Sequence, residues 1–158
     1  MKKIIISFLI LFIVILLITL SGNIFVKNPS FLKPSARITI NKQVFNLLLA
    51  KTAKEKQVGL SQKKSLPSDY GMVFAFEKQG YYSFWMKDMK FPIDIIFIKN
   101  KKIVTIYDSA KPPSSKNESL IIYQPTETAD TVLEINAGLS KKYGFKRGME
   151  VKYENFGS

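Results

Sequence analysis

The chain has 158 residues, enough for one globular domain and a short additional segment. It contains neither cysteine nor histidine, which excludes disulfides, thiolate or imidazole metal sites, and catalysis by a cysteine nucleophile or a histidine base. With 24 basic and 12 acidic residues, its net charge of +12 favours anionic partners. Chemistry based on carboxylates, lysine, serine or oxygen-ligated metals is still open, but no recognised motif supports it. We therefore predict neither a metal nor a cofactor.

The N-terminus is strongly hydrophobic. Lys2 and Lys3 precede an apolar run that continues, with one polar break, to Val26. As a helix this run spans roughly 34 Å, enough to cross a hydrocarbon core of about 30 Å. A cleaved secretory signal has a shorter apolar region and a small-x-small cleavage site, of which Thr19-x-Ser21 is a poor version. The length favours an uncleaved transmembrane helix, with the cleaved signal as the alternative.

Both interpretations place the remainder of the chain outside the cytoplasm. We predict an anchor or signal over 1–26, a linker over 27–36 and an extracytoplasmic domain over 37–158. The protein would be a single-pass cell-membrane protein, or a secreted one if the signal is cleaved. Without the three lysines before residue 28, the chain still has 21 basic and 12 acidic residues. Outside a membrane, this surplus of positive charge favours lipid head groups or cell-wall polymers as partners, and not nucleic acid. The alternative is that the scattered lysines only form a solvated surface.

The domain itself shows many short, mostly apolar segments separated by turn residues. A capping box at Thr52 and Glu55 predicts a short helix that ends at Gly59, and a second short helix is expected over 138–143. The polar stretch 108–119 predicts a long surface loop. We expect strands over 37–40, 44–50, 72–76, 82–86, 93–98, 103–107, 120–123, 131–137 and 151–153, with turns at Asn41-Lys42 and Asn100-Lys101. This pattern predicts a mainly β domain, an antiparallel β-sandwich, jelly-roll-like or barrel fold with one or two short helices.

One aspartate lies within the most apolar of these segments. The β-branched and aromatic residues of 93–98 are typical of a strand buried on both faces, and Asp94 falls inside it. A lone buried carboxylate is very costly, so Asp94 must be paired, hydrogen-bonded or placed at the end of the strand. Pro92 favours the strand start, because proline is tolerated there. We expect Asp94 close to Trp85 and Lys87 of the preceding segment.

The remaining candidate residues share faces of predicted strands. Alternation places Trp85 and Lys87 on one face, and Glu134 and Asn136 on one face. If these faces coincide, their polar groups gather with Asp94 at one end of the domain, with the tryptophan as a wall. We therefore predict a ligand-binding site made of Trp85, Lys87, Asp94, Glu134 and Asn136. The alternative is a structural network in which the lysine pairs with one of the two carboxylates.

Three functions are compatible with this residue set. We favour a non-catalytic domain that binds a small polar ligand or an anionic cell-envelope ligand at the outer membrane face, because little chemistry is possible without histidine or cysteine. The first alternative is a hydrolase that uses Asp94 and Glu134 as an acid–base pair, which requires carboxyl groups about 5–9.5 Å apart across a groove. The second is an assembly partner of another membrane protein, which an exposed apolar patch far from Trp85 would favour.

Several sequence runs occur together in one known family. They are Ala50-x-Thr52-x-x-Glu55-Lys56-x-x-Gly59-Leu60, Gly71-Met72-x-Phe74, Phe84-Trp85-Met86-Lys87, Pro92-Ile93-Asp94-Ile95 and Val132-Leu133-Glu134-Ile135-Asn136-Ala137-Gly138. On these runs, the chain from about Ile38 to Tyr153 resembles the uncharacterised bacterial and archaeal family catalogued as domain of unknown function 192. The resemblance implies a compact, mostly β domain of sandwich or jelly-roll type that is often exported. It implies no activity.

Overall fold

The computed structural model describes residues 36–115 and 117–156, so the expected anchor and nearly all of the expected linker lie outside the described residues. Within these ranges, no helix is both long and apolar enough to span a membrane. The described strands form a seven-stranded sheet in the order β6-β5-β8-β3-β2-β1-β9 and a two-stranded sheet of β4 and β7. Their bounds are β1 Arg37–Ile40, β2 Gln43–Ala50, β3 Tyr70–Gly80, β4 Phe84–Trp85, β5 Ile93–Lys99, β6 Lys102–Ala110, β7 Ile122–Tyr123, β8 Ala129–Asn136 and β9 Val151–Glu154.

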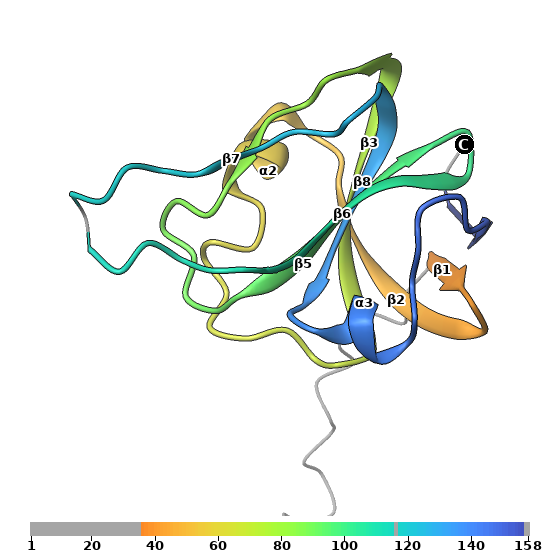
Figure 1. Cartoon of the computed structure of the whole chain (residues 1–158), viewed down its shortest axis with the longest axis horizontal. Helices are drawn as coiled ribbons and strands as arrows, with labels where there is room; N and C mark the ends of the chain where they lie inside the picture. Colours follow the sequence, from red (N-terminus) through yellow and green to blue (C-terminus); the bar gives the residue numbers. More distant parts are fainter. Residues whose placement is uncertain (1–35, 116, 157–158) are drawn as a thin grey trace, which may run out of the picture. The chain divides into compact units, whose positions relative to one another are not determined.

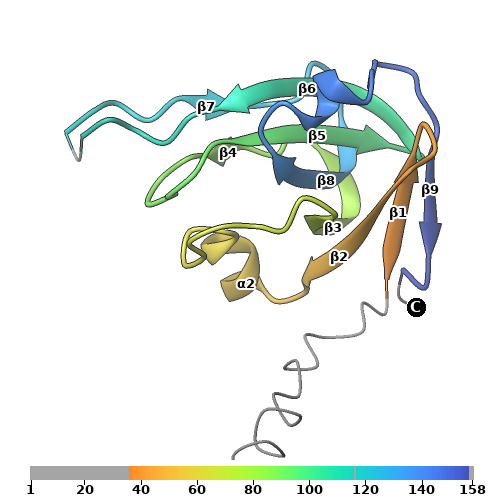
Figure 2. The same cartoon turned by 90° about the horizontal axis from the view of Figure 1, so that it is seen from below.

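The large sheet curls into a half-barrel, as Figure 2 shows. Its two edges are joined at one end, where the N–H of Ile103 donates to the carbonyl of Met149 at 3.0 Å and the N–H of Val151 donates to Lys101 at 2.8 Å. The prediction of a mainly β domain with short helices is confirmed. Of the predicted alternatives the barrel is the closest and the sandwich is not found, because the main sheet is one curled half-barrel where a sandwich has two facing sheets.

The strands are not all antiparallel as predicted, because β2 and β3 run parallel. Parallel neighbours need a long crossover connection, which here runs from Lys51 to Asp69 and contains α2, Ala53–Val58. The predicted capping box starts this helix: the Glu55 N–H donates to Thr52 Oγ1 at 3.1 Å, and the Thr52 N–H donates to Glu55 Oε2 at 2.8 Å. The crossover places the chain after α2 against the same core cluster as β3 and β4.

Two hairpins are closed by the predicted asparagine-lysine turns. Asn41 and Lys42 have φ angles of 45° and 68°, and Asn100 and Lys101 have φ angles of 49° and 61°. Two consecutive residues with positive φ are the mark of a type I′ turn, which matches the twist of the flanking strands. In Figures 1 and 2, a long loop between β6 and β7 projects away from the sheet, as the polar composition of this stretch predicts.

The centre of the large sheet is buried on both faces. Strand β5 is buried along all but its last residue. Alternate side chains enter two separate core clusters: Met72, Phe74, Ile95, Phe97 and Val132 belong to one, and Val73, Ile96, Ile98, Leu133 and Ile135 belong to the other. Glu134 stands between members of the second cluster in sequence, so its side chain points to the face of the first cluster.

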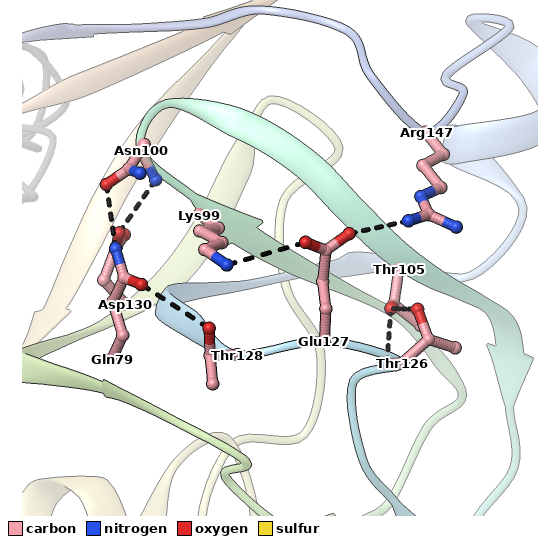
Figure 3. A network of polar contacts seen from close by, with 9 residues as sticks. All are labelled: Gln79, Lys99, Asn100, Thr105, Thr126, Glu127, Thr128, Asp130 and Arg147. Atoms are coloured by element: carbon pink, nitrogen blue, oxygen red, sulfur yellow. Dashed lines mark hydrogen bonds and ion pairs between the residues drawn. The ribbon is translucent and has the colours of Figure 1, made fainter.

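A polar network holds the segment before β8 against the turn between β5 and β6 (Figure 3). The N–H of Asn100 donates to Asp130 Oδ2 at 2.8 Å, and Glu127 pairs with Lys99 at 3.6 Å and with Arg147 at 2.7 Å. These ion pairs are partly exposed, so each contributes little to stability. We assign the network a structural role.

Candidate functional site

A pocket of about 280 Å³ lies between α2, β3 and β4, with one residue of β8 in its wall. Its walls are largely aromatic and are formed by Phe74, Phe76, Tyr82, Phe84 and Trp85. Its charged lining groups are Lys56, Lys87 and Glu134. An apolar concavity with a few convergent polar groups is the usual form of a small-ligand site.

The aromatic walls are fixed by strand geometry and by ring packing. Phe74 and Phe76 are two residues apart on β3 and therefore share a face. Phe84 packs edge-on against Phe74 with 5.1 Å between ring centroids, and Tyr82 stacks on Phe76 at an interplanar angle of 11°. Strand β4 pairs with β7, which places Trp85 opposite an exposed isoleucine and leaves the indole 46% exposed. The pocket is thus preformed in the protein.

The carboxyl group of Glu134 is the unusual feature of the pocket. Glu134 is only 6% exposed, and its buried Oε2 atom has no hydrogen-bond partner among residues 36–115 and 117–156. The residues directly opposite it in the sheet are Met72 of β3 and Ile95 of β5, both apolar. Burial raises the pKa of Glu134 to about 8, so the acid is mostly protonated at neutral pH. Few buried polar groups in proteins are left unpaired, so this one indicates a specific role.

Gly59, directly after α2, leaves room above this carboxyl group. A Cβ atom at this position would lie 3.4 Å from Cζ of Phe74 and 4.0 Å from Oε2 of Glu134. The residue also has a φ of 50°, which favours glycine. The glycine therefore serves both the turn after the helix and the space next to the buried acid.

Two lysines add positive charge to the pocket. Lys56 donates from Nζ to the carbonyl of Ala75, and its Nζ lies 4.6 Å from the centre of the Phe76 ring. Lys87 is exposed, and within the described ranges no carboxylate forms an ion pair with it. The alternative of a structural pair between Lys87 and Asp94 or Glu134 is therefore not found there. At neutral pH the pocket combines two cations with a largely neutral acid.

Asp94 lies elsewhere and has a different role. Its Oδ1 atom accepts hydrogen bonds from the N–H groups of Ser109 and Gly138, and its Oδ2 atom accepts one from Ser140, all at 2.8 Å. The carboxylate is fully buried and holds two segments at once. One segment is an irregularity near the end of β6, where Ser109 has a φ of 53°. The other is the start of α3, Leu139–Lys142.

The expectation that Asp94 lies near Trp85 and Lys87 was wrong. In the pairing of β5 with β8, Ile95 lies opposite Glu134 and Asp94 lies opposite Ile135. Because successive side chains alternate, the two carboxyl groups project from opposite faces of the sheet. They cannot flank one substrate, so the acid–base pair of the hydrolase alternative does not form.

Asn136 also lies outside the pocket, although it shares a face with Glu134 as predicted. Its Nδ2 atom donates to the carbonyls of Leu66 and Pro67 at 2.8 and 3.2 Å, which fixes the loop before β3. Of the five predicted residues, the structure brings Trp85, Lys87 and Glu134 together around one pocket.

The role of Asn136 can be tested by stability. In Asn136→Ala two loop carbonyls lose their donor, and we expect the free energy of unfolding to fall by about 1–2 kcal/mol. Thermal unfolding of the full-length chain in detergent, followed by the fluorescence of its single tryptophan, measures the change. Asn117→Ala in the exposed loop is the matched control and should leave the midpoint unchanged. If both variants unfold at the same temperature, the side chain of Asn136 does not have this structural role.

Several lining residues were missed by the sequence analysis, chiefly Lys56, Gly59, Phe76 and Tyr82. The sequence did indicate the helix and its terminal glycine. It did not show that the crossover brings them over Glu134, because that contact depends on the parallel pairing of β2 and β3. Beyond the predicted tryptophan wall, the alternation of Phe74 with Phe76 and of Tyr82 with Phe84 was an available signal for further aromatic walls.

The model of the DUF192 family, described as an uncharacterised ACR family, matches residues 36–153. This chain belongs to the DUF192 family. Among curated proteins, none matches it.

Two crystal structures are similar to this DUF192 chain. A protein of unknown function from Novosphingobium aromaticivorans is 30% identical with a TM-score of 0.64, and the match covers 74% of this chain and 82% of that one. A putative transcription regulator from Sinorhizobium meliloti is 28% identical with a TM-score of 0.65, and the match covers 77% of this chain and 93% of that one. Both support the fold of the DUF192 domain.

Proposed function

We propose that this DUF192 domain binds a small polar ligand in the pocket at Glu134 and that the N-terminal segment holds it at the outer face of a cell membrane. The observation that carries the binding proposal is the buried Oε2 atom of Glu134, which has no hydrogen-bond partner in the part of the chain that the structure describes and belongs to a residue in the wall of an aromatic pocket. A buried acid in an otherwise apolar layer lowers stability, which is typical of residues retained for function.

Neither alternative function has comparable support. The hydrolase alternative requires Asp94 and Glu134 to face one groove, and they lie on opposite faces of the sheet. The assembly alternative predicts an apolar patch far from Trp85. The exposed apolar residues of β7 and the loop before it lie instead beside Trp85, because Ile122 pairs with it directly.

Substitution of the buried acid tests the binding proposal. We expect small hydroxylated ring compounds to bind the full-length chain in detergent, as detected by saturation-transfer NMR of the ligands. Glu134→Met keeps the length of the side chain but removes its hydrogen bond, so binding should weaken by about tenfold or more. Glu77→Met is the control, because Glu77 is exposed on the same strand as Phe76 and does not line the pocket. Equal binding to both variants would contradict the proposal.

The proposed location has its own test. The apolar run over 4–26 is long enough to span a bilayer, and the lysines at its start favour a cytoplasmic N-terminus. Protease added to intact cells should release a fragment that begins between Lys27 and Arg37. A chain that is cleaved only after the membrane has been opened would place the domain inside, and a fragment already free in the medium would favour the cleaved signal.

A further inference from the structure

We propose, on the basis of the function proposed above, that the ligand is a single-ring hydroxy acid. Its hydroxyl group meets Glu134 at the closed end of the pocket, and its carboxylate lies at the rim beside Lys56 and Lys87. The ring occupies the space between the aromatic walls. Aromatic acids and sugar acids share this chemistry, and the experiment below distinguishes them.

The charge of the pocket selects an anion. The titratable side chains that line it are Lys56 of α2, Tyr82, Lys87 and Glu134, and the hydroxyl of Tyr82 donates to the backbone. The two lysines carry positive charge, whereas burial raises the pKa of Glu134 to about 8. The positive charges therefore exceed the negative charge at neutral pH. A cationic ligand would meet repulsion at the rim and no full negative charge at the base.

Size and shape restrict the ligand to one ring. The pocket volume of about 280 Å³ lies just below the usual range for drug-sized ligands, which is about 300–1,000 Å³. The rings of Phe84 and Trp85, which line the pocket and are partly exposed, offer apolar surfaces to which both an aromatic ring and the apolar face of a sugar can bind. The buried Oε2 atom of Glu134 then finds its missing partner in the ligand hydroxyl.

This arrangement couples binding to the protonation of Glu134. The residues directly opposite it on β3 and β5 are Met72 and Ile95, so no other charge on these strands faces it directly. A bound anion favours the neutral form of the acid. As the pH rises through the pKa of Glu134, the acid ionises and the affinity for the anion falls. Glutamine resembles the protonated acid, so Glu134→Gln should bind the anion without this pH dependence.

A matched set of probes tests the ligand class on the full-length chain in detergent. The probes are 4-(hydroxymethyl)benzoate, its amide and 4-(hydroxymethyl)benzylamine, with D-glucuronate and D-glucose as a sugar pair. At about pH 6.5 we expect the acid to bind about three- to tenfold more tightly than the amide, and the amine most weakly. Lys87→Gln should lower the ratio of the affinities for the acid and the amide by about threefold. Lys90→Gln, in the same loop but outside the pocket lining, should keep it.

The pH dependence gives a second, independent readout. Between about pH 6.5 and pH 9, the affinity for the acid should fall about tenfold in the native chain and stay level in Glu134→Gln. Tighter binding of glucuronate than of the benzoate would identify the ligand as a sugar acid, and the reverse order would identify it as an aromatic acid. Both outcomes support a single-ring hydroxy acid. If the amine binds more tightly than the acid, the ligand is not a hydroxy acid, but the pocket still binds a small polar ligand as proposed. If no probe binds at millimolar concentration, both proposals fail.

Discussion

Replacement of Asp94 by asparagine is expected to destabilise the domain by about 3 kcal/mol or more, because the carboxylate accepts three backbone hydrogen bonds in a fully buried position. Asparagine has nearly the same shape, but its amide nitrogen would face an N–H donor and could not accept from it. Bonds to charged groups are the stronger class, and an uncompensated buried group adds its desolvation cost. The midpoint of thermal unfolding should fall by more than about 10 °C.

The same substitution at an exposed aspartate serves as the control. Asp88 is exposed and has a φ of 58°, a conformation that asparagine adopts readily. We expect Asp88→Asn to unfold at the native temperature, as measured with Trp85 fluorescence on the full-length chain. A loss below about 1 kcal/mol for Asp94→Asn would mean that this carboxylate does not organise the bulge of β6 and the start of α3.

Glu134→Gln is expected to have the opposite effect, one that depends on pH. The pKa of Glu134 is about 8 in the folded chain, against an ordinary value of 4.5. Between these values, the folded state holds a proton that the unfolded state has released. The contribution of Glu134 protonation to the free energy of unfolding is therefore fully present below pH 4.5. It falls by about 1.4 kcal/mol per pH unit as the pH rises from there toward 8. Glutamine cannot ionise, so near pH 8 the variant should be more stable by an amount on the order of 4 kcal/mol.

The difference between native chain and variant isolates this one residue. Other titrating groups contribute equally to both proteins and cancel when denaturant unfolding is compared across the pH range. Glu77→Gln, on an exposed part of β3, should give a flat difference. A flat difference for Glu134→Gln as well, or a less stable variant near pH 8, would show that the acid is ionised and paired in the folded state.

The parts of the fold that rest on local patterns could be predicted from the sequence. The capping box at Thr52, the turn at Asn100-Lys101 and the doubly buried strand 93–98 depend on residues adjacent in the chain, and the structure confirms all three. The curl of the sheet and the parallel pairing of β2 with β3 depend on contacts between distant segments. No local pattern determines them, and the sandwich interpretation failed for that reason.

The candidate site shows the same division. Trp85 was marked as the single tryptophan, and alternation along the predicted strands added Lys87 and Glu134, and all three line the pocket. Asp94 gave the same signal as Glu134, an acid among apolar residues. The two differ in what surrounds them: Asp94 accepts three backbone hydrogen bonds, whereas Oε2 of Glu134 has no partner within the described ranges. The register of β5 and β8 decides which carboxylate faces which surroundings.

The most direct test of the binding account is a crystal structure of the full-length chain grown with 4-(hydroxymethyl)benzoate. The account predicts one probe molecule between the aromatic walls, with its hydroxyl oxygen about 2.5–3.0 Å from a carboxyl oxygen of Glu134. Its carboxylate should lie on the side of Lys87. A structure in which Oε2 of Glu134 bonds to another group of the protein, with the pocket closed to the probe, would contradict the account.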